Sequence, residues 1–380
     1  MTKKILCITN DFGPRAGGIE SFVIGLIERM PFGSVTVYTS SQAGSPAFDQ
    51  AWKKNFGVDV IRDKSKVLLP TPRVARATSR LAQEIGANSA FFGAAAPLSI
   101  LAPAIRRAGV ENIVALTHGH EVWWAKVPPF KCAIRFMGRH TDHLTYLGNF
   151  TKSAISRSLS KAATSQMVRI APGIDTDHFS PQPTAQQLRA ELGLSKKKVI
   201  VSVGRLVHRK GQDYLVRSLP TILTQHPDAH LLFVGEGPYR EHLEKLVAER
   251  KLESHVTFIG RVQFKDLPRY ICVGDVFAMP SRSRMGGLEV EGLGIVYLEA
   301  SSCGIPVVGG LSGGAPDAVL EGETGFAVDG TSEEAIANAI GKILSDPELA
   351  RRMGERGRTW AVEKWRWEIW SKEFNALLGL

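Results

Sequence analysis

The sequence predicts an α/β protein with two domains, and three observations lead to this prediction. Its 380 residues suffice for two domains with separate hydrophobic cores. Each half begins with an apolar strand, a glycine turn and a helix: residues 4–9 precede Gly17 and Gly18, and residues 198–204 precede a helix from Gln212. A segment rich in turn-forming residues, 171–183, separates the two halves and is typical of a linker.

Composition places the chain among soluble globular proteins, because 44% of its residues are hydrophobic and 22% are charged. No apolar run reaches the roughly 20 residues of a membrane-spanning helix. Residues 1–4 lead directly into a strand, so we expect no signal peptide. The cysteines, at positions 7, 132, 272 and 303, lack the spacing of a metal site and suit a reducing cytoplasm.

The net charge of +10 comes entirely from the first half of the chain. Residues 1–171 hold 22 Lys and Arg against 10 Asp and Glu, whereas residues 172–380 hold 25 against 27. A basic half predicts an acidic partner, either nucleic acid or an anionic membrane surface. No interleaving of aromatic and basic residues and no known module supports nucleic acid, so the membrane is the favoured partner.

A basic amphipathic helix is predicted over residues 72–85. Arg73, Arg76 and Arg80 share one face of it, and Val74 and Leu81 mark an apolar side. Our hypothesis is that the three arginines meet acidic headgroups at the membrane. The alternative is an ordinary solvated surface helix.

Two carboxylates eight residues apart, Glu291 and Glu299, flank a glycine-rich turn and the start of a helix from Ile295. Gly292 and Gly294 leave the backbone bare, and the first N–H groups of the helix favour a phosphate. A diphosphate between hydroxyl-rich groups fits this layout. The alternative is a helix that carries a Glu on each side of its N-terminus without functional meaning.

Other candidate residues follow predicted strands. Arg205 and Lys210 come after the strand 198–204, where two cations suit an anionic leaving group. His118 follows the strand 112–117, at the end where open α/β sheets bind ligands. Gly17 and Gly18 lie between the strand 4–9 and a predicted helix, which is the phosphate-binding arrangement of α/β folds. The alternative is a turn that needs positive φ.

We predict no metal site. His118, His120 and Glu121 have a metal-like pattern, but no other ligand cluster in the sequence supports it. Asp175 and Asp177 have the spacing of a metal-binding pair of aspartates, but they lie in the turn-rich segment 171–183, and we interpret them as part of the linker.

Taken in order, these motifs resemble the retaining glycosyltransferases of family four. The resemblance covers nearly the whole chain and implies the GT-B fold, with two Rossmann-like domains facing a central cleft. Residues 1–170 would bind the acceptor and residues 171–359 the nucleotide-sugar donor. The C-terminal helix, about 360–380, would cross back to the first domain, with its tryptophans as packing anchors.

The resemblance also implies the role of each candidate residue. Glu291 would face the donor sugar and Glu299 the ribose. Arg205 and Lys210 would stabilise the departing diphosphate without metal, and His118 would approach the sugar; with Glu291 these are the predicted catalytic residues. The remaining donor contacts would come from Gly17, Gly18, Val262, Gly292, Leu293, Gly294 and Ile295.

Within the family, the chain looks most like actinobacterial GDP-mannose-dependent phosphatidylinositol-mannoside mannosyltransferases. This implies GDP-mannose as donor, an anionic phospholipid acceptor and a cytoplasmic enzyme peripherally bound to the inner face of the plasma membrane. Three alternatives stay open: another nucleotide sugar, another acceptor, or an epimerase or hydrolase activity on the same fold. The sequence also does not separate a front-face mechanism from a double displacement. A nicotinamide dehydrogenase would need a glycine fingerprint that is missing.

Overall fold

The computed structural model describes residues 3–15 and 17–380 and divides into two compact units. The first holds residues up to Gly173 together with Trp367–Leu380, and the second holds Ile174–Arg366. The first boundary thus lies close to the expected residue 170. The return to the first unit comes at Trp367, because residues 360–366 belong to the second unit.

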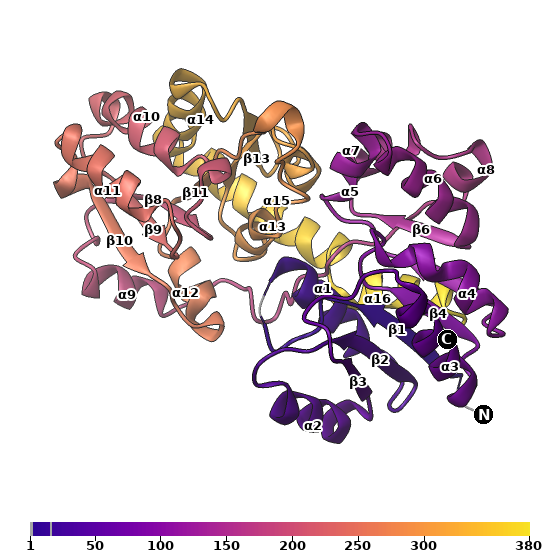
Figure 1. Ribbon diagram of the computed structural model, residues 1–380. Coiled ribbons are helices and arrows are strands. Elements are labelled where there is room, and N and C mark those ends of the chain that lie inside the picture. The colour runs from indigo at the N-terminus through magenta and orange to yellow at the C-terminus, as the bar shows by residue number, and fades with distance from the viewer. Residues whose placement is uncertain (1–2, 16) are drawn as a thin grey trace. The chain divides into compact units, whose positions relative to one another are not determined.

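The first unit is built on a parallel sheet (Figure 1). Its strands lie in the order β3 (Asp59–Asp63), β2 (Val35–Ser40), β1 (Ile5–Thr9), β4 (Ser89–Phe92), β5 (Asn112–Ala115), β6 (His143–Tyr146) and β7 (Val168–Arg169). Its helices are α1 (Gly18–Ile27), α2 (Ser45–Phe56), α3 (Pro72–Glu84), α4 (Ala102–Arg107), α5 (Glu121–Lys126), α6 (Phe130–His140), α7 (Asn149–Ser156), α8 (Lys161–Ser165) and α16 (Trp367–Leu377).

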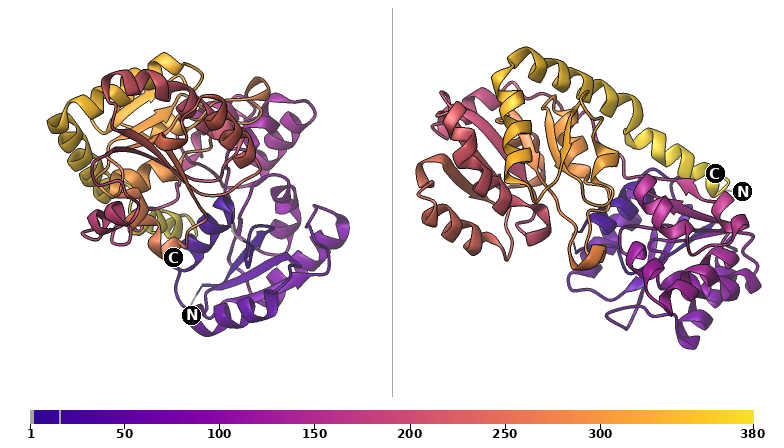
Figure 2. Two further views of the ribbon diagram at one scale, coloured as in Figure 1. Left: turned by 90° about the vertical axis from the view of Figure 1, so that its left-hand side faces the viewer. Right: turned by 90° about the horizontal axis from the view of Figure 1, so that it is seen from above.

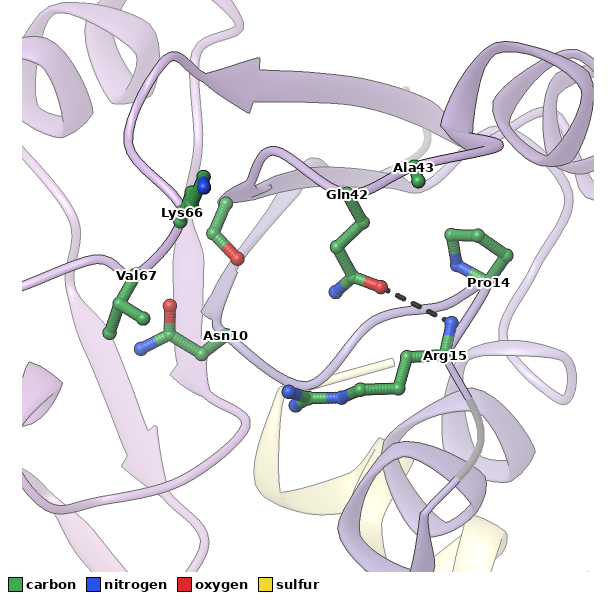
Figure 3. A pocket seen from close by; sticks show the side chains of 8 residues that line it. Asn10, Pro14, Arg15, Gln42, Ala43, Lys66 and Val67 are labelled. Atoms are coloured by element: carbon green, nitrogen blue, oxygen red, sulfur yellow. Dashed lines mark hydrogen bonds between the residues drawn. The ribbon is translucent and has the colours of Figure 1, made fainter.

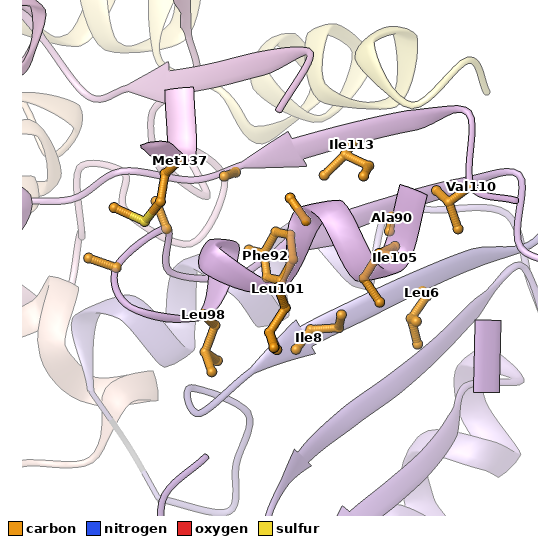
Figure 4. Close-up of a cluster of buried hydrophobic side chains, with 14 of the residues drawn as sticks. Leu6, Ile8, Ala90, Phe92, Leu98, Leu101, Ile105, Val110, Ile113 and Met137 are labelled. Carbon is orange, nitrogen blue, oxygen red and sulfur yellow. The ribbon is translucent and has the colours of Figure 1, made fainter. Parts of the chain in front are cut away.

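Side chains on one face of this sheet form a buried apolar cluster (Figure 4). Leu6 and Ile8 of β1 point to the same side because alternate strand residues share a face, and Phe92 of β4 joins them. Leu101 and Ile105, in and just before α4, cover them. This packing fixes the directions in which β1 and β4 deliver the loops that follow them.

The opposite face of the first sheet is covered by α1 and the C-terminal helix α16. Phe374 of α16 packs edge-on against Phe91 of β4, with ring centroids 5.2 Å apart. A Cβ added at Gly25 of α1 would lie 2.4 Å from the Trp367 ring, so the glycine gives the tryptophan room. The end of the chain lies beside its beginning (Figure 2), with Gly379 next to Lys3.

The second unit also has a parallel sheet, in the order β10 (Val256–Gly260), β9 (Ala229–Val234), β8 (Lys198–Val203), β11 (Val276–Met279), β12 (Val307–Gly310) and β13 (Gly325–Val328). Its helices are α9 (Ala185–Glu191), α10 (Gln212–Gln225), α11 (Arg240–Glu249), α12 (Leu267–Ile271), α13 (Ile295–Ser302), α14 (Glu333–Ser345) and α15 (Pro347–Lys364). Helices α10, α11 and α14 share a buried cluster with one face of the sheet. Tyr297 of α13 packs edge-on against Phe277 of β11, with ring centroids 6.0 Å apart.

In each sheet the strand order reverses at one place, between β1 and β4 in the first unit and between β8 and β11 in the second. The loops that leave the carboxyl ends of two such strands diverge and open a crevice, which is where open α/β sheets bind ligands. Most of the predicted donor residues of the second unit follow β8 and β11, with Val262 after β10, and the predicted donor and catalytic residues of the first unit follow β1 and β5. Among the described residues, no helix is both long and apolar enough to cross a membrane.

Candidate functional site

Glu291 is the centre of the candidate site in the second unit. One of its carboxylate oxygens, Oε2, lies 2.8 Å from Lys210 Nζ and 3.0 Å from Arg209 Nη1. Burial alone would raise the pKa of Glu291, but the charges of Lys210 and Arg209 hold this pKa below its usual value. Glu291 is therefore an ionised carboxylate that neutralises two cations from the loop after β8.

The loops after β8 and β11 contact each other directly, and these contacts fix the positions of Arg209 and Lys210. Gly211 has φ of 76°, and a Cβ there would lie 2.0 Å from the carbonyl oxygen of Pro280. The buried Arg282 forms two hydrogen bonds with Asp213, of 2.7 and 2.9 Å. Its backbone N–H also donates to the carbonyl of Arg209 at 2.9 Å. The cation pair is therefore held in place before any ligand arrives.

Glycines keep the backbone of the Glu291 loop close to its neighbours. The N–H of Gly314 donates to the carbonyl of Glu291 at 2.8 Å, and a Cβ at Gly314 would lie 2.1 Å from the carbonyl oxygen of Gly292. Gly294 caps α13 with φ of 78°, and no side chain caps the N-terminus of this helix within the part of the chain that the structure describes. The N–H groups of Ile295 and Val296 are thus left for another acceptor, whereas that of Tyr297 donates to the carbonyl of Gly294 at 3.0 Å.

Glu299 lies one turn inside α13 in a different environment. Burial raises the pKa of Glu299 to about 7, and the charge of Lys210 only partly opposes this rise. The two carboxylates of the motif therefore differ in charge state near neutral pH, although both are glutamates. Such a separation of pKa values is typical of functional sites.

The other donor residues predicted from the sequence are placed less centrally. Arg205 is exposed on the loop after β8, while Arg209, which the prediction missed, contacts Glu291 beside Lys210. Leu293 is buried within the Glu291 loop. Val262 is half-buried in the loop after β10, two strands from β8, so its contact with a base stays a prediction.

In the first unit, His118 is buried at the end of β5. Its Nε2 lies 2.8 Å from the carbonyl oxygen of Gly93, which requires the ring proton on Nε2. Burial lowers the pKa of His118, although Glu121 works against this shift. Glu121, missed as a partner, accepts hydrogen bonds from the N–H groups of His118 and Ala96, so it joins the loops after β4 and β5.

Gly17 and Gly18 begin α1. Neither has positive φ, so a turn that needs positive φ does not explain them. A Cβ at Gly17 would lie 2.2 Å from Glu20 Oε2, whereas no described atom lies within 4 Å of a Cβ at Gly18. Gly17 is therefore explained by packing against Glu20, and Gly18 leaves open space in front of the helix.

The three arginines of α3 are not equivalent. Arg73 binds Asp63 through two hydrogen bonds of 2.7 and 2.9 Å, and this guanidinium holds the pKa of Asp63 well below its usual range. Arg76 and Arg80 line a hollow of about 460 Å³ between α3 and α4, together with Arg107. Arg73 is thus paired with a carboxylate although its side chain is 60% exposed, whereas the exposed Arg76, Arg80 and Arg107 form no ion pair within the described residues.

Among residues 3–15 and 17–380, no three His, Cys, Asp or Glu side chains gather as a metal-binding group. The anion-binding features described above are cations and backbone N–H groups. They suit a phosphate-bearing ligand.

Comparison with known proteins adds three findings. A family model described as "Glycosyl transferases group 1" matches residues 184–360. The chain is 44% identical over 377 residues to the GDP-mannose-dependent alpha-(1-6)-phosphatidylinositol monomannoside mannosyltransferase of Mycolicibacterium smegmatis, covering 99% of this chain and 98% of that one. It is 37% identical over 380 residues to the GDP-mannose-dependent monoacylated alpha-(1-6)-phosphatidylinositol monomannoside mannosyltransferase of Corynebacterium glutamicum, covering 99% and 98%.

Among solved structures, the chain resembles Anabaena HepE in complex with UDP, with a TM-score of 0.82, 20% sequence identity and 99% of both chains covered. The likeness extends over both parallel sheets, and at this level of identity it bears on the fold alone. The architecture expected from the sequence, two Rossmann-like domains of the GT-B type, is confirmed.

Proposed function

The chain belongs to the group 1 glycosyltransferases, and from this premise we propose that it transfers α-mannose from GDP-mannose to a phosphatidylinositol mannoside, with retention of configuration. The observation that carries the proposal is the cluster of Glu291, Lys210 and Arg209 beside the uncapped start of α13. Relatives with these substrates in their names match the chain along nearly its whole length.

The second unit has the chemistry that a nucleoside diphosphate leaving group needs. Lys210, Arg209 and the first N–H groups of α13 would take the negative charge that develops as the bond to the sugar breaks. The exposed Arg205 would close over the same diphosphate. We propose that this unit binds the donor without metal, because these groups supply the positive charge that a metal would otherwise bring.

Glu291 would orient the sugar while the acceptor hydroxyl attacks the same sugar face and loses its proton to a donor phosphate oxygen. In a double displacement, Glu291 would instead form a covalent bond with the sugar. His118, held neutral in the first unit, stays a predicted sugar contact.

Calorimetric titration with GDP, UDP and ADP, each with EDTA and with magnesium, tests the donor. We expect GDP to bind most tightly and with the same affinity in EDTA. Preference for UDP would replace the donor by a UDP-sugar. Transfer of labelled mannose to phosphatidylinositol mannoside then tests the reaction, and release of mannose without an acceptor would favour a hydrolase.

Glu299 gives the donor affinity a predicted pH dependence. If Glu299 accepts hydrogen bonds from the ribose hydroxyls, its ionised form binds better, so the affinity for GDP-mannose should fall as pH drops from 8 to 6 through the pKa of about 7. The diphosphate diester of this donor keeps its charge over the range. In Glu299→Gln the affinity should be weaker and nearly constant with pH, as measured by calorimetry. Equal pH profiles for both proteins would remove Glu299 from the binding site.

We propose that the protein acts at the inner surface of the plasma membrane, held there by Arg76, Arg80 and Arg107. Neutralising Arg76 and Arg80 together with Gln should weaken binding to anionic vesicles about tenfold, since each basic residue near such a surface contributes about 1 kcal/mol before screening by salt. Co-sedimentation measures the change. Gln at Arg351 and Arg352, exposed on α15, removes the same charge and should have little effect. If both double variants lost vesicle binding equally, the binding would depend on the net charge of the protein and not on Arg76 and Arg80 in particular.

A further inference from the structure

A pocket of about 560 Å³ lies in the first unit (Figure 3), and His118 is not one of its lining residues. It is formed at the carboxyl ends of the neighbouring strands β1, β2 and β3, by the loops that follow them. Its lining consists of Asn10, Pro14, Arg15, Ser40, Gln42, Ala43, Lys66 and Val67. A concave site at this edge of a parallel sheet, with polar groups from separate loops, is typical of ligand binding.

The loop that carries Lys66 is fixed to the sheet. The amide of Asn10 forms two hydrogen bonds with the backbone of Leu68, of 2.7 and 3.1 Å, and the Leu68 side chain is fully buried. Ser65 is bonded to Asp63 through both its N–H and its hydroxyl. Lys66 and Val67 are therefore presented from a braced loop.

Two cations face this pocket and differ in how they are paired. Arg15 forms ion pairs with Glu20 at 2.6 Å and with Asp11 at 3.6 Å, and its side chain is 63% exposed. Lys66 is exposed and forms no ion pair or hydrogen bond within the described part of the chain. By contrast, Arg62 of β3 is neutralised by Asp49, to which its guanidinium donates two hydrogen bonds. Lys66 therefore supplies a positive charge to the pocket that no carboxylate among the described residues neutralises.

The remaining lining suits hydroxyl groups on one side and an apolar group on the other. Asn10, Ser40 and Gln42 carry amides and a hydroxyl, and Figure 3 shows the Gln42 and Asn10 side chains bordering the same space as Arg15. Val67 and its near neighbour Leu69 are 59% and 54% exposed. Two exposed aliphatic side chains around an anchored Leu68 form an apolar rim beside the charged pocket.

We propose that this pocket binds a phosphate ester that carries hydroxyl groups, namely the headgroup phosphate of the lipid acceptor, with Lys66 and Arg15 as its cations. Val67 and Leu69 then contact the acyl side of that phosphate. The inference rests on the proposed function for the identity of the acceptor. A soluble sugar phosphate has the same phosphate and hydroxyl chemistry, but it has no acyl chain that would contact the apolar rim.

Binding of glycerophosphoinositol to the full chain, followed by calorimetry or NMR, tests the polar part. Lys66→Gln should weaken this binding about tenfold, through loss of one charge-assisted hydrogen bond, and Lys66→Arg should restore most of it. Inorganic phosphate should compete with the ligand in the wild type. Lys54→Gln, on an exposed position of α2, is the control. Equal binding by Lys66→Gln and the control would overturn the assignment.

Vesicles of phosphatidylcholine and phosphatidylinositol distinguish the two sources of the phosphate. Val67→Ser with Leu69→Ser should weaken binding to these vesicles severalfold and leave binding of glycerophosphoinositol unchanged. If the double serine variant bound these vesicles as tightly as the wild type, the phosphate in the pocket would not be that of a lipid. The affinity for GDP should be the same in all these variants. If the wild type transferred no mannose but still bound glycerophosphoinositol in a Lys66-dependent way, only the proposed function would be wrong. If the wild type transferred mannose normally and Lys66→Gln bound glycerophosphoinositol as tightly as the wild type, only this inference would be wrong.

Discussion

Replacing Glu291 by Gln is expected to lower kcat for mannosyl transfer by at least about a hundredfold, the range found when a group that acts in the transition state is removed. The Kd for GDP should stay equal or become tighter. The reason is that Glu291 neutralises Lys210 and Arg209 in the free protein, so its loss frees both cations for the diphosphate. Initial rates at saturating donor and calorimetry with GDP measure the two effects separately.

A matched control for this variant is Glu323→Gln. Glu323 is also paired with an arginine, Arg356 at 3.0 Å, but lies outside the loops after β8 and β11. The Glu323→Gln substitution should leave kcat and the Kd for GDP unchanged. If Glu291→Gln kept normal turnover, Glu291 would have no part in the reaction. Mass spectrometry of the protein after exposure to donor alone adds a mechanistic readout, because only a double displacement leaves mannose bound to Glu291.

The strands named from the sequence were predictable because each is an apolar run that stops at glycine or a polar turn. The strand predicted over 198–204 is β8, and the helix predicted from Ile295 is α13, which begins at that residue. The C-terminal stretch was harder. It was expected as one crossing helix from about residue 360, but α15 ends at Lys364 and α16 begins at Trp367. Its tryptophans are divided between the two units, which no local pattern could indicate.

Residue types in the candidate site were predictable, but their partners were not. Arg209 and Lys210 are adjacent in the sequence, but the sequence does not show that both contact Glu291. The left-handed turn at Gly211 and the hydrogen bond from the Arg282 N–H to the Arg209 carbonyl position the two cations. The helical spacing of the α3 arginines is equally visible, yet Arg73 is bound by Asp63 from the end of β3. The contact between Arg209 and Glu291 joins loops that are 82 residues apart in the chain, whereas Arg73 and Asp63 are ten residues apart and meet only because α3 packs beside the end of β3.

Desolvation and pockets are likewise properties of the folded chain. The spacing of Glu291 and Glu299 is visible in the sequence, but the rise in the pKa of Glu299 follows from its burial inside α13. The pocket around Lys66 was missed because its lining comes from three loops, none of which carries a recognisable motif.

Replacing Lys210 by Met is expected to weaken GDP binding by about a hundredfold, because a mostly buried cation with charge-assisted hydrogen bonds to a phosphate contributes about 2 to 3 kcal/mol. The Lys210 side chain is only 12% exposed, so solvent screens little of its charge. Loss of Lys210 also removes the charge that lowers the pKa values of Glu291 and Glu299. Both carboxyls should then titrate at higher pH.

The loss of affinity in Lys210→Met should depend on the phosphates of the ligand. Binding of guanosine, which has none, should be unchanged, binding of GMP should fall slightly and binding of GDP should fall most. Lys245→Met, on the exposed face of α11, removes the same charge and should affect none of the three. Because Arg209 still pairs with Glu291 in the variant, we expect it to fold, and thermal melting checks this. A uniform loss for guanosine and GDP would mean that Lys210 supports the shape of the loop after β8, whereas a loss for GDP alone places Lys210 on the diphosphate.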